Sequence, residues 1–233
     1  MTREEYIKRL FATYSLMGVL SEKNGCKVLR LRNKMSGGDM VLRSFPQHLD
    51  AYALLCGIRC ENLPEIFDAI DVDDGQIVLE EYIDGVTVAQ VMEGGKYHYW
   101  GAKKVLSCVC HALSVLHERG LVHRDVKPEN VMIGSDGRVV LIDFNASRKV
   151  SEACKDTVIM GTVGYASPEQ LGVTQTDART DIYAVGVLLN VMLTGKHPTE
   201  AFARGHAGRV VKKCTSLNPD DRYQSARILK NAL

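Results

Sequence analysis

Four side chains of complementary chemistry lie within nineteen positions of one another in the middle of the chain: Asp125, Lys127, Asn130 and Asp143. Asn130 and Asp143 supply oxygens of the hard type that Mg²⁺ prefers, so they are candidate metal ligands. Asp125 is suited to accept a proton from a hydroxyl, and Lys127 to balance the charge of a phosphoryl group in transfer. Together these four residues predict phosphoryl transfer assisted by a divalent metal.

A predicted hairpin explains how Asn130 and Asp143 come together. The segment "NVMIGSDGRVVLID" has apolar runs on both sides of a "GSDG" turn, which is a hairpin signal. Its outward strand begins after Asn130, and its return strand brings Asp143 back beside it.

Helical patterns dominate the chain from Gly95 onward. An apolar face between Val105 and Leu116 predicts a helix that stops at Gly120. Asp181 is expected to cap an almost wholly apolar helix, "IYAVGVLLNVML", which should be buried on all sides. The final "ARILKNAL" predicts another helix.

The first eighty residues predict short strands and one helix. "VLRLR" and "MVLR" flank the turn "NKMSGGD" as a hairpin. Ser44 is expected to cap a helix that carries Pro46 in its first turn, and "QIVLEEYIDG" predicts a strand ending at Gly85. The chain is therefore expected to be α+β, with a mostly-β lobe at 1–83 and a mostly-α lobe at 84–233.

Composition restricts the class of protein. The 233 residues carry a net charge of +1, which calls for neither nucleic acid nor anionic lipid as a partner. The longest apolar run, 183–193, is too short to span a membrane, and the first thirty residues show no signal pattern. The seven scattered cysteines are typical of reduced thiols, so we expect a cytoplasmic protein with a genuine N-terminus. A zinc site at "CVCH" is disfavoured because residues two apart on a helix point apart.

The motif "HRDVKPEN" followed by "IDF" resembles the catalytic and metal-binding loops of protein kinases, and its Lys resembles the serine/threonine branch. Three further segments extend the resemblance. "GTVGYASPEQ" resembles the end of the activation segment, "TDARTDIYAVGVLL" the central helix of bacterial members, and "NPDDRYQSARILKNAL" the closing helix. The match is specific from residue 80 to 233 and weaker from about 13 to 79.

The resemblance implies one kinase domain of two lobes with a cleft between them. It makes Asp125, Lys127 and Asn130 catalytic, and Asn130 and Asp143 the ligands of Mg²⁺ or Mn²⁺. It also implies that six residues contact ATP: Lys23, Val28, Arg43, Glu80, Glu81 and Ile83. Glu169 and Arg222 are expected to form a buried structural ion pair.

The glycine-rich phosphate loop of the family is degenerate in this chain. Ser21, Lys23 and Cys26 stand at its three glycine positions, and Gly25 lies one place off. Glycine allows backbone to approach phosphates and to adopt conformations that side chains forbid. This departure is the strongest argument against ordinary activity.

Arg43 stands where the family has a lysine, and arginine is not interchangeable with lysine at a phosphate site. The expected helix glutamate is also missing, since Ala51 takes its place. We hypothesise that Arg43 pairs with Glu80 or Asp50; the alternative is a solvated Arg43 on an exposed strand.

Two more positions concern the segment after Asp143. Asn145 replaces a glycine at an expected bend, and Asn is among the non-glycine residues best suited to positive φ. A phosphate on Thr157 would pair with Arg124, although an unmodified surface Thr157 fits the sequence equally well. Thr162 is expected to contact Asp125 and Lys127.

Three functions compete: an active serine/threonine protein kinase, a pseudokinase that binds or scaffolds, and a small-molecule phosphotransferase. The intact activation segment disfavours the third, and the complete catalytic set favours the first over the second. The expected partners are therefore ATP and a protein substrate with a Ser or Thr acceptor, with no nucleic acid and no membrane within this chain. Only about a dozen residues lie between "TGKHP" and "VVKKC", so the chain resembles a trimmed kinase and its substrate and oligomeric state stay open.

Overall fold

The computed structural model describes residues 2–23, 25–150, 162, 164–171 and 175–233. The chain divides into two compact units, one made of 1–60 and 64–83 and the other of 61–63 and 84–233. Residues 61–63 thus belong to the second unit, although the sequence assigned them to the first lobe. The first unit is mostly strand and the second mostly helix, as expected for the α+β class.

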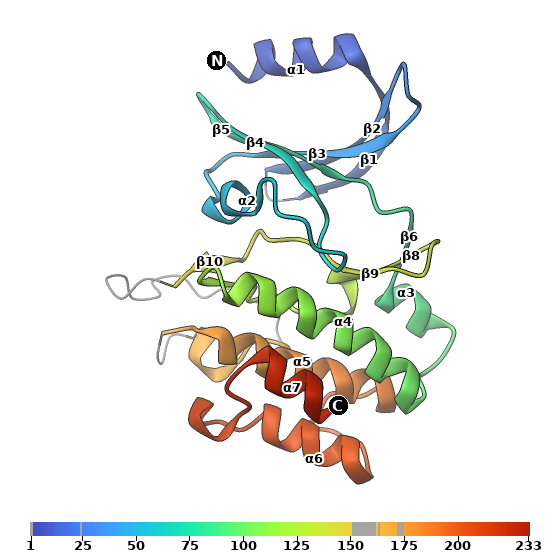
Figure 1. Cartoon of the computed structure of the whole chain (residues 1–233), viewed down its shortest axis with the longest axis vertical. Coiled ribbons are helices and arrows are strands. Elements are labelled where there is room, and N and C mark those ends of the chain that lie inside the picture. Colours follow the sequence, from blue (N-terminus) through green and yellow to red (C-terminus); the bar gives the residue numbers. More distant parts are fainter. Residues whose placement is uncertain (1, 24, 151–161, 163, 172–174) are drawn as a thin grey trace. The chain divides into compact units, whose positions relative to one another are not determined.

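The first unit is built on a five-stranded antiparallel sheet with the order β1-β2-β3-β5-β4 (Figure 1). Its strands are β1 (Tyr14–Lys23), β2 (Cys26–Asn33), β3 (Asp39–Phe45), β4 (Ile66–Val72) and β5 (Gly75–Glu81). The predicted hairpin of "VLRLR" and "MVLR" is confirmed as the β2–β3 pair. The two faces of this sheet have different neighbours.

One face of the sheet packs against helix α1 (Arg3–Thr13), where Tyr6, Leu10 and Phe11 contact a core that includes Leu31 and Leu42. The sequence analysis, which allowed one helix in this lobe, missed α1. Its apolar residues Tyr6, Ile7, Leu10 and Phe11 recur at helical spacing, so the signal for this helix was available in the sequence. The start of α1 is also marked by a capping box, "TREE". The Thr2 hydroxyl accepts from the N–H of Glu5, and the Glu5 carboxylate accepts from the N–H of Thr2.

The opposite face carries Arg43 and Phe45, and helix α2 (Asp50–Leu55) packs there through Tyr52, whose ring centroid lies 5.3 Å from that of Phe45. The predicted cap of this helix was wrong. Ser44 stays within β3, where its hydroxyl accepts a hydrogen bond from the Arg3 guanidinium, and α2 begins after Leu49 without a side-chain cap. The Ser44 hydroxyl therefore bonds to Arg3, which is distant in sequence, and does not cap the helix that follows it.

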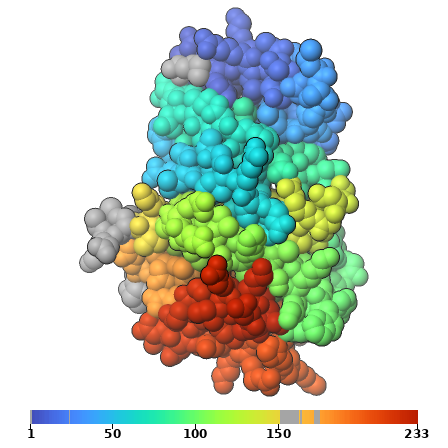
Figure 2. Space-filling model, in the orientation of Figure 1, coloured from blue at the N-terminus to red at the C-terminus, as the bar shows by residue number. Residues whose placement is uncertain are grey.

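The second unit is mainly helical. Its helices are α3 (Val88–Glu93), α4 (Tyr99–His117), α5 (Ala178–Thr194), α6 (Gly205–Cys214) and α7 (Ala226–Ala232). Short 3₁₀ segments lie at Pro128–Asn130, Pro168–Leu171 and Pro219–Asp221. Helix α7 packs on α4 and α6 on α5, and Figure 2 shows α6 and α7, in red, forming the surface at one end of this unit.

Small sheets complete the second unit. The strands β6 (Gly85–Thr87), β8 (Val131–Gly134) and β9 (Val139–Leu141) form one antiparallel sheet, and β7 (Leu121–Val122) pairs with β10 (Arg148–Lys149). The predicted hairpin around "GSDG" is confirmed as β8–β9.

Helix α5 is buried along most of its length, as its composition predicted, but its cap is not Asp181. Asp177 is the N-cap: its side chain accepts from the backbone N–H groups of Arg179 and Thr180, and the Thr180 hydroxyl accepts from the backbone N–H of Asp177. Asp181 lies one turn further on and is fully buried. Across the described part of the chain, no helix combines the length and apolarity needed to cross a membrane.

Candidate active site

The β8–β9 hairpin joins the two halves of the catalytic cluster. Val131 pairs with Leu141 across the hairpin, and the N–H of Ile142 donates to the carbonyl of Asn130 at 2.9 Å. The backbone of Asp143 therefore follows directly from a residue bonded to Asn130. The predicted closeness of these two positions is confirmed at the level of the backbone.

Asp125 is the centre of a hydrogen-bonded network. Its Oδ1 accepts from the Thr162 hydroxyl at 2.6 Å, and its Oδ2 lies 2.7 Å from the Lys127 ammonium. Lys127 also donates to Thr162 Oγ1 at 2.7 Å, and Asn130 Nδ2 donates to Asp125 Oδ2 at 2.9 Å. The contact expected between Thr162 and this pair is present.

The electrostatics of the network keep Asp125 ionised. Burial raises the pKa of Asp125, but the hydrogen bonds from Lys127 and Thr162 outweigh it and hold the pKa below its ordinary value. Asp125 is therefore a carboxylate near neutral pH, the form that can accept a proton.

Two residues at the edges of the cluster have left-handed backbone. Arg124 has φ 68° and Asp143 has φ 69°, and in the described part of the chain no other non-glycine residue has positive φ. Such backbone costs about 1–3 kcal/mol and is concentrated at functional sites. The bend was expected at Asn145; it lies instead at Asp143, whose Oδ1 accepts from the N–H of Asn145 at 3.2 Å.

A buried carboxylate on α5 holds the loop that carries Arg124 and Asp125. Asp181 accepts the backbone N–H of Arg124 at 2.7 Å and that of His123 at 2.9 Å, and its Oδ2 lies 2.8 Å from His117 Nε2. The sequence analysis missed this role because it took Asp181 for a helix cap. The sequence did contain a signal for this role, because Asp181 lies within an apolar helix. A carboxylate that is buried there requires hydrogen-bond donors from other parts of the chain.

His123 is a second residue that the sequence analysis quoted without giving it a role. Its ring lies 3.2 Å from the carbonyl of Ile142 and packs edge-on against Phe144, with centroids 5.6 Å apart. His123 is fully buried, so it connects the catalytic loop to the segment that bears Asp143.

The oxygens near the cluster fit a cation that takes few protein ligands. Asn130 turns its Nδ2 toward Asp125, at 2.9 Å, so its amide is oriented by the network. Within the described ranges, no three His, Cys, Asp or Glu side chains converge in a way that would hold a metal unaided. Mg²⁺ binds through one or two protein ligands together with substrate phosphates and water, and Asn130 and Asp143 match that requirement.

The expected ion pair between Glu169 and Arg222 is present and buried. Arg222 donates to the two carboxylate oxygens at 2.6 and 2.9 Å, and Thr180 donates to Oε1 at 3.0 Å. Burial raises the pKa of Glu169, while the bonds from Arg222 and Thr180 produce a net lowering. The pair joins the segment at Pro168–Leu171 to the region before α7.

In the first unit, Arg43 pairs with Glu80 and not with Asp50. The distance from Arg43 Nε to Glu80 Oε1 is 2.7 Å, and the two residues are 8% and 3% exposed. The solvated alternative for Arg43 was therefore wrong. Both residues lie on the face of the sheet opposite α1, on the neighbouring strands β3 and β5.

The degenerate phosphate loop is a tight β1–β2 hairpin. Lys23, which is exposed, pairs with Cys26, and Ser21 pairs with the buried Val28. Gly25 has φ 76° and so supplies the positive-φ position of the turn, one place from where the family pattern has a glycine.

Two further predicted ATP contacts follow at the end of β5. The N–H of Glu81 donates to the carbonyl of Glu65 at 2.8 Å. Ile83 is buried and is the last residue of the first unit.

The proposed phosphorylation site, Thr157, lies outside the described residues. Arg124, its expected partner, is 6% exposed, and burial together with the nearby Arg148 lowers the pKa of its guanidinium. The pairing of Thr157 with Arg124 stays a prediction.

The chain matches the family model described as the protein kinase domain over residues 26–213, well over half of its length. The chain therefore belongs to the protein kinase family, and the resemblance drawn from its motifs is confirmed. The two-lobed α+β fold expected from that resemblance is confirmed with it.

Several similar curated proteins come from bacteria. A probable serine/threonine-protein kinase PknB from Lactococcus lactis is 29% identical over 198 residues, covering 82% of this chain and 31% of the relative. The serine/threonine-protein kinase PknB of Mycolicibacterium smegmatis is 33% identical over 177 residues, covering 64% and 28%. A probable serine/threonine-protein kinase from Clostridium perfringens is 32% identical over 171 residues, covering 72% and 24%. The chain thus spans less than a third of the length of each relative.

Proposed function

We propose that this domain is an active serine/threonine protein kinase that transfers the γ-phosphoryl group of ATP to a protein hydroxyl. The observation that supports this most strongly is the complete Asp125 network, in which Lys127, Thr162 and Asn130 hold one ionised carboxylate. A chain that only binds partners has no need for a base oriented by three donors.

In the proposed reaction Asp125 accepts the proton of the Ser or Thr hydroxyl while the hydroxyl oxygen attacks the γ-phosphorus. The bond from that phosphorus to the bridging oxygen of ADP breaks, and ADP leaves with the bond electrons. Lys127 is 2.7 Å from Asp125 and offsets negative charge on the group in transfer. Asn130 and Asp143 would hold Mg²⁺ or Mn²⁺, which neutralises phosphate charge when bound.

Residues of the first unit are proposed to bind the nucleotide. Arg43 contacts the α- and β-phosphates, with Glu80 taking the orienting part that a helix acid has in the family pattern. The backbone of Glu81 and Ile83 receives the adenine, Val28 contacts its ring, and Lys23 adds charge near the phosphates. The proposed boundary between the nucleotide-binding and catalytic lobes is at residues 83 and 84.

A pseudokinase is the second candidate, and the changed phosphate-binding residues of the first unit favour it. Arg43 stands where the family has a lysine, and the glycines of the phosphate loop are replaced, so both usual phosphate contacts of the first unit are altered. Activation through a phosphate on Thr157 that pairs with Arg124 is part of the active-kinase proposal and not of the pseudokinase alternative.

Intact-protein mass spectrometry separates the two candidates. The domain is incubated with ATP and either Mg²⁺ or Mn²⁺, with a generic basic protein as substrate, beside the variant Asp125→Asn. Phosphate-sized mass gains that vanish in Asp125→Asn support the active kinase, and mapping them to Thr157 supports its activation. Absence of any gain, with ATP binding retained, would establish the pseudokinase.

A further inference from the structure

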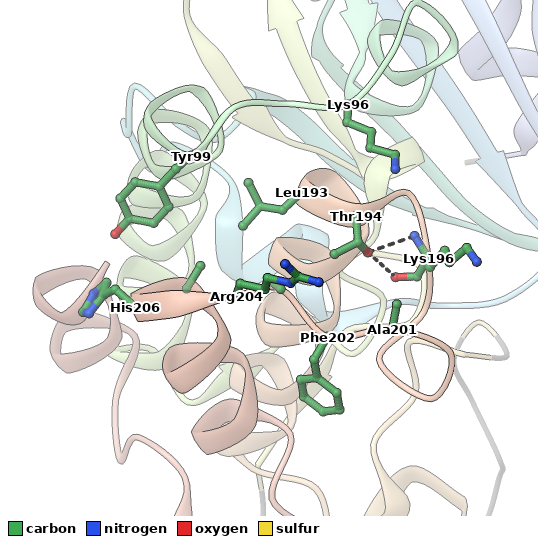
Figure 3. A pocket seen from close by; sticks show the side chains of 11 residues that line it. Lys96, Tyr99, Leu193, Thr194, Lys196, Ala201, Phe202, Arg204 and His206 are labelled. Atoms are coloured by element: carbon green, nitrogen blue, oxygen red, sulfur yellow. Dashed lines mark hydrogen bonds between the residues drawn. The ribbon is translucent and has the colours of Figure 1, made fainter.

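A pocket of about 670 Å³ opens on the second unit, and none of its lining residues belongs to the catalytic cluster (Figure 3). It lies where the start of α4, the end of α5 and the start of α6 meet the loop between α5 and α6. The apolar part of its lining consists of Tyr99, Leu193, Ala201, Phe202, Ala203 and Ala207. Its volume is in the range of small-molecule sites.

The charged part of the lining is entirely cationic. Lys96, Lys196 and Arg204 contribute to the wall, and the lining contains no acidic residue. Within the described part of the chain, none of the three has an acidic partner within ion-pair distance. In Figure 3 Lys96 and Lys196 lie on one side of the pocket and Tyr99 on the other, with Leu193 and Arg204 between them. The pocket therefore offers positive charge beside an apolar surface.

Three other polar lining groups are already engaged, and one of them is the Thr194 hydroxyl, which donates to the carbonyl of Asn190 at 2.8 Å. The Tyr99 hydroxyl donates to the carbonyl of Leu233, and His206 Nε2 lies 2.8 Å from the carbonyl of Ala232. These contacts fix that side of the pocket against α7. The three cations are thus the groups left to meet a ligand.

The loop that forms the pocket wall is held by Asn190, a fully buried residue of α5. Its Nδ2 donates to the carbonyls of Lys196 and Ala201 at 2.8 and 2.7 Å, and its Oδ1 accepts the N–H of Ala203 at 2.8 Å. A buried amide is costly unless it is bonded, and here three of its bonds go to the loop. The wall is therefore preformed, which lowers the entropy cost of binding.

We propose that this pocket binds a small amphipathic carboxylate. The apolar body of the ligand contacts Leu193 and Phe202, and its carboxylate meets Lys196 and Arg204, of which arginine can form two parallel hydrogen bonds. An acidic peptide would carry the same charge, but the pocket wall consists of helix ends and a loop. No described lining residue belongs to a strand that could pair with a peptide backbone.

Calorimetric titration with dodecanoate below its micelle concentration tests the proposal, with dodecanol and dodecyltrimethylammonium as neutral and cationic probes. We expect one dodecanoate per domain, with binding weakened about tenfold or more for the other two probes. The variant Lys196→Glu/Arg204→Glu should lose affinity to the same degree. The control Lys212→Glu/Arg227→Glu, which makes the same charge change at exposed positions outside the lining, should bind as the wild type does.

Three outcomes would overturn the proposal. They are the absence of saturable dodecanoate binding, equal binding by Lys196→Glu/Arg204→Glu, and equal binding of the three probes. Unfolding of the charge-reversed variant is excluded by its circular dichroism and melting temperature, and Ala201→Trp, which fills the pocket without changing charge, provides an independent loss of binding. An acidic peptide that binds the wild type where dodecanoate does not would assign the surface to a protein partner. None of these results depends on phosphotransfer.

Discussion

The two units of this domain follow the protein kinase pattern to different degrees. In the second unit Asp125, Lys127, Asn130 and Asp143 all retain the expected residue type, and they lie in one hydrogen-bonded and backbone-linked cluster. In the first unit the glycine positions and the phosphate-binding lysine have changed. A base or a metal ligand needs a particular functional group, whereas a phosphate cradle needs backbone donors and positive charge, which several residues can supply.

The first unit also shows how an altered position is compensated. Arg43 brings a guanidinium where the family has an ammonium, and its counter-ion comes from the neighbouring strand and not from α2, where Ala51 is buried in place of an acid. Gly25 supplies a positive-φ residue in the turn between β1 and β2. The second unit shows no such exchange among its four candidate catalytic residues, Asp125, Lys127, Asn130 and Asp143.

The largest expected effect tests whether the second unit is catalytic. Asp125→Asn removes the base while keeping a side chain that can bond to Lys127 and Thr162, so we expect phosphotransfer to fall by about 10²- to 10⁴-fold with little change in melting temperature. Glu129→Gln makes the same carboxylate-to-amide change at an exposed position of the same loop and should remain active. Equal rates for Asp125→Asn and wild type would remove Asp125 from the mechanism.

The next effect compares the two buried ion pairs. Arg43→Met leaves Glu80 buried without its cation, and Arg222→Met does the same to Glu169. Each should lower the free energy of unfolding by about 3–5 kcal/mol in chemical denaturation. Arg227→Met, at an exposed position of α7, serves as the control and should change it by less than about 0.5 kcal/mol.

A double variant separates stability from nucleotide binding in the first unit. Arg43→Met/Glu80→Met replaces the pair by apolar side chains of similar length, so most of the lost stability should return. ATP affinity should not return if Arg43 contacts phosphate. Recovery of both stability and ATP affinity would show that the pair is only structural.

A smaller effect concerns the protonation of Asp125. Thr162→Ala removes a hydrogen bond that stabilises the carboxylate, so the pKa of Asp125 should rise toward its ordinary value of about 3.9. Because the folded pKa is depressed, Asp125 adds stability above its unfolded pKa, and this contribution is lost as pH falls through the folded pKa. Carboxyl ¹³C titration should show the upward shift; an unchanged or lower pKa in Thr162→Ala would mean that Lys127 and Asn130 alone determine it.

The smallest effect is expected at Asn145. Since the positive φ lies at Asp143, restoring the family glycine with Asn145→Gly relieves no strain and adds flexibility, so stability should fall by less than about 1 kcal/mol. Phosphotransfer should change by less than about threefold. A large gain in rate would mean that Asn145 restrains the segment after Asp143.

The parts of this molecule that sequence could predict are those fixed by local pattern. The β2–β3 and β8–β9 hairpins have turn residues between apolar runs, and α4 and α5 have clear apolar faces. The motif spacing also placed Asp143 beside Asn130. Helix α1 was missed although Tyr6, Ile7, Leu10 and Phe11 recur at helical spacing, because charged residues interrupt this segment.

What sequence could not assign were side chains with distant partners. Ser44 was expected to cap α2 but accepts from Arg3, and Asp181 was expected to cap α5 but accepts two N–H groups of the catalytic loop. In each case the residue is of a type that can cap a helix, but its side chain bonds to a group that is distant in sequence. Glu80 was foreseen as one of two partners of Arg43, because strand alternation determined its face and left only the choice between candidates.

The pairing of Arg43 with Glu80 also limits how this domain can change by mutation. Each single change to an uncharged residue passes through a chain with one unmatched charge in the sheet, whereas a joint change avoids it. We therefore expect strong epistasis: in a library of random variants of positions 43 and 80, folded members should be enriched in matched pairs, either both charged or both apolar. The two positions therefore change together, and the single steps that keep the charges balanced are conservative ones such as Arg43→Lys or Glu80→Asp.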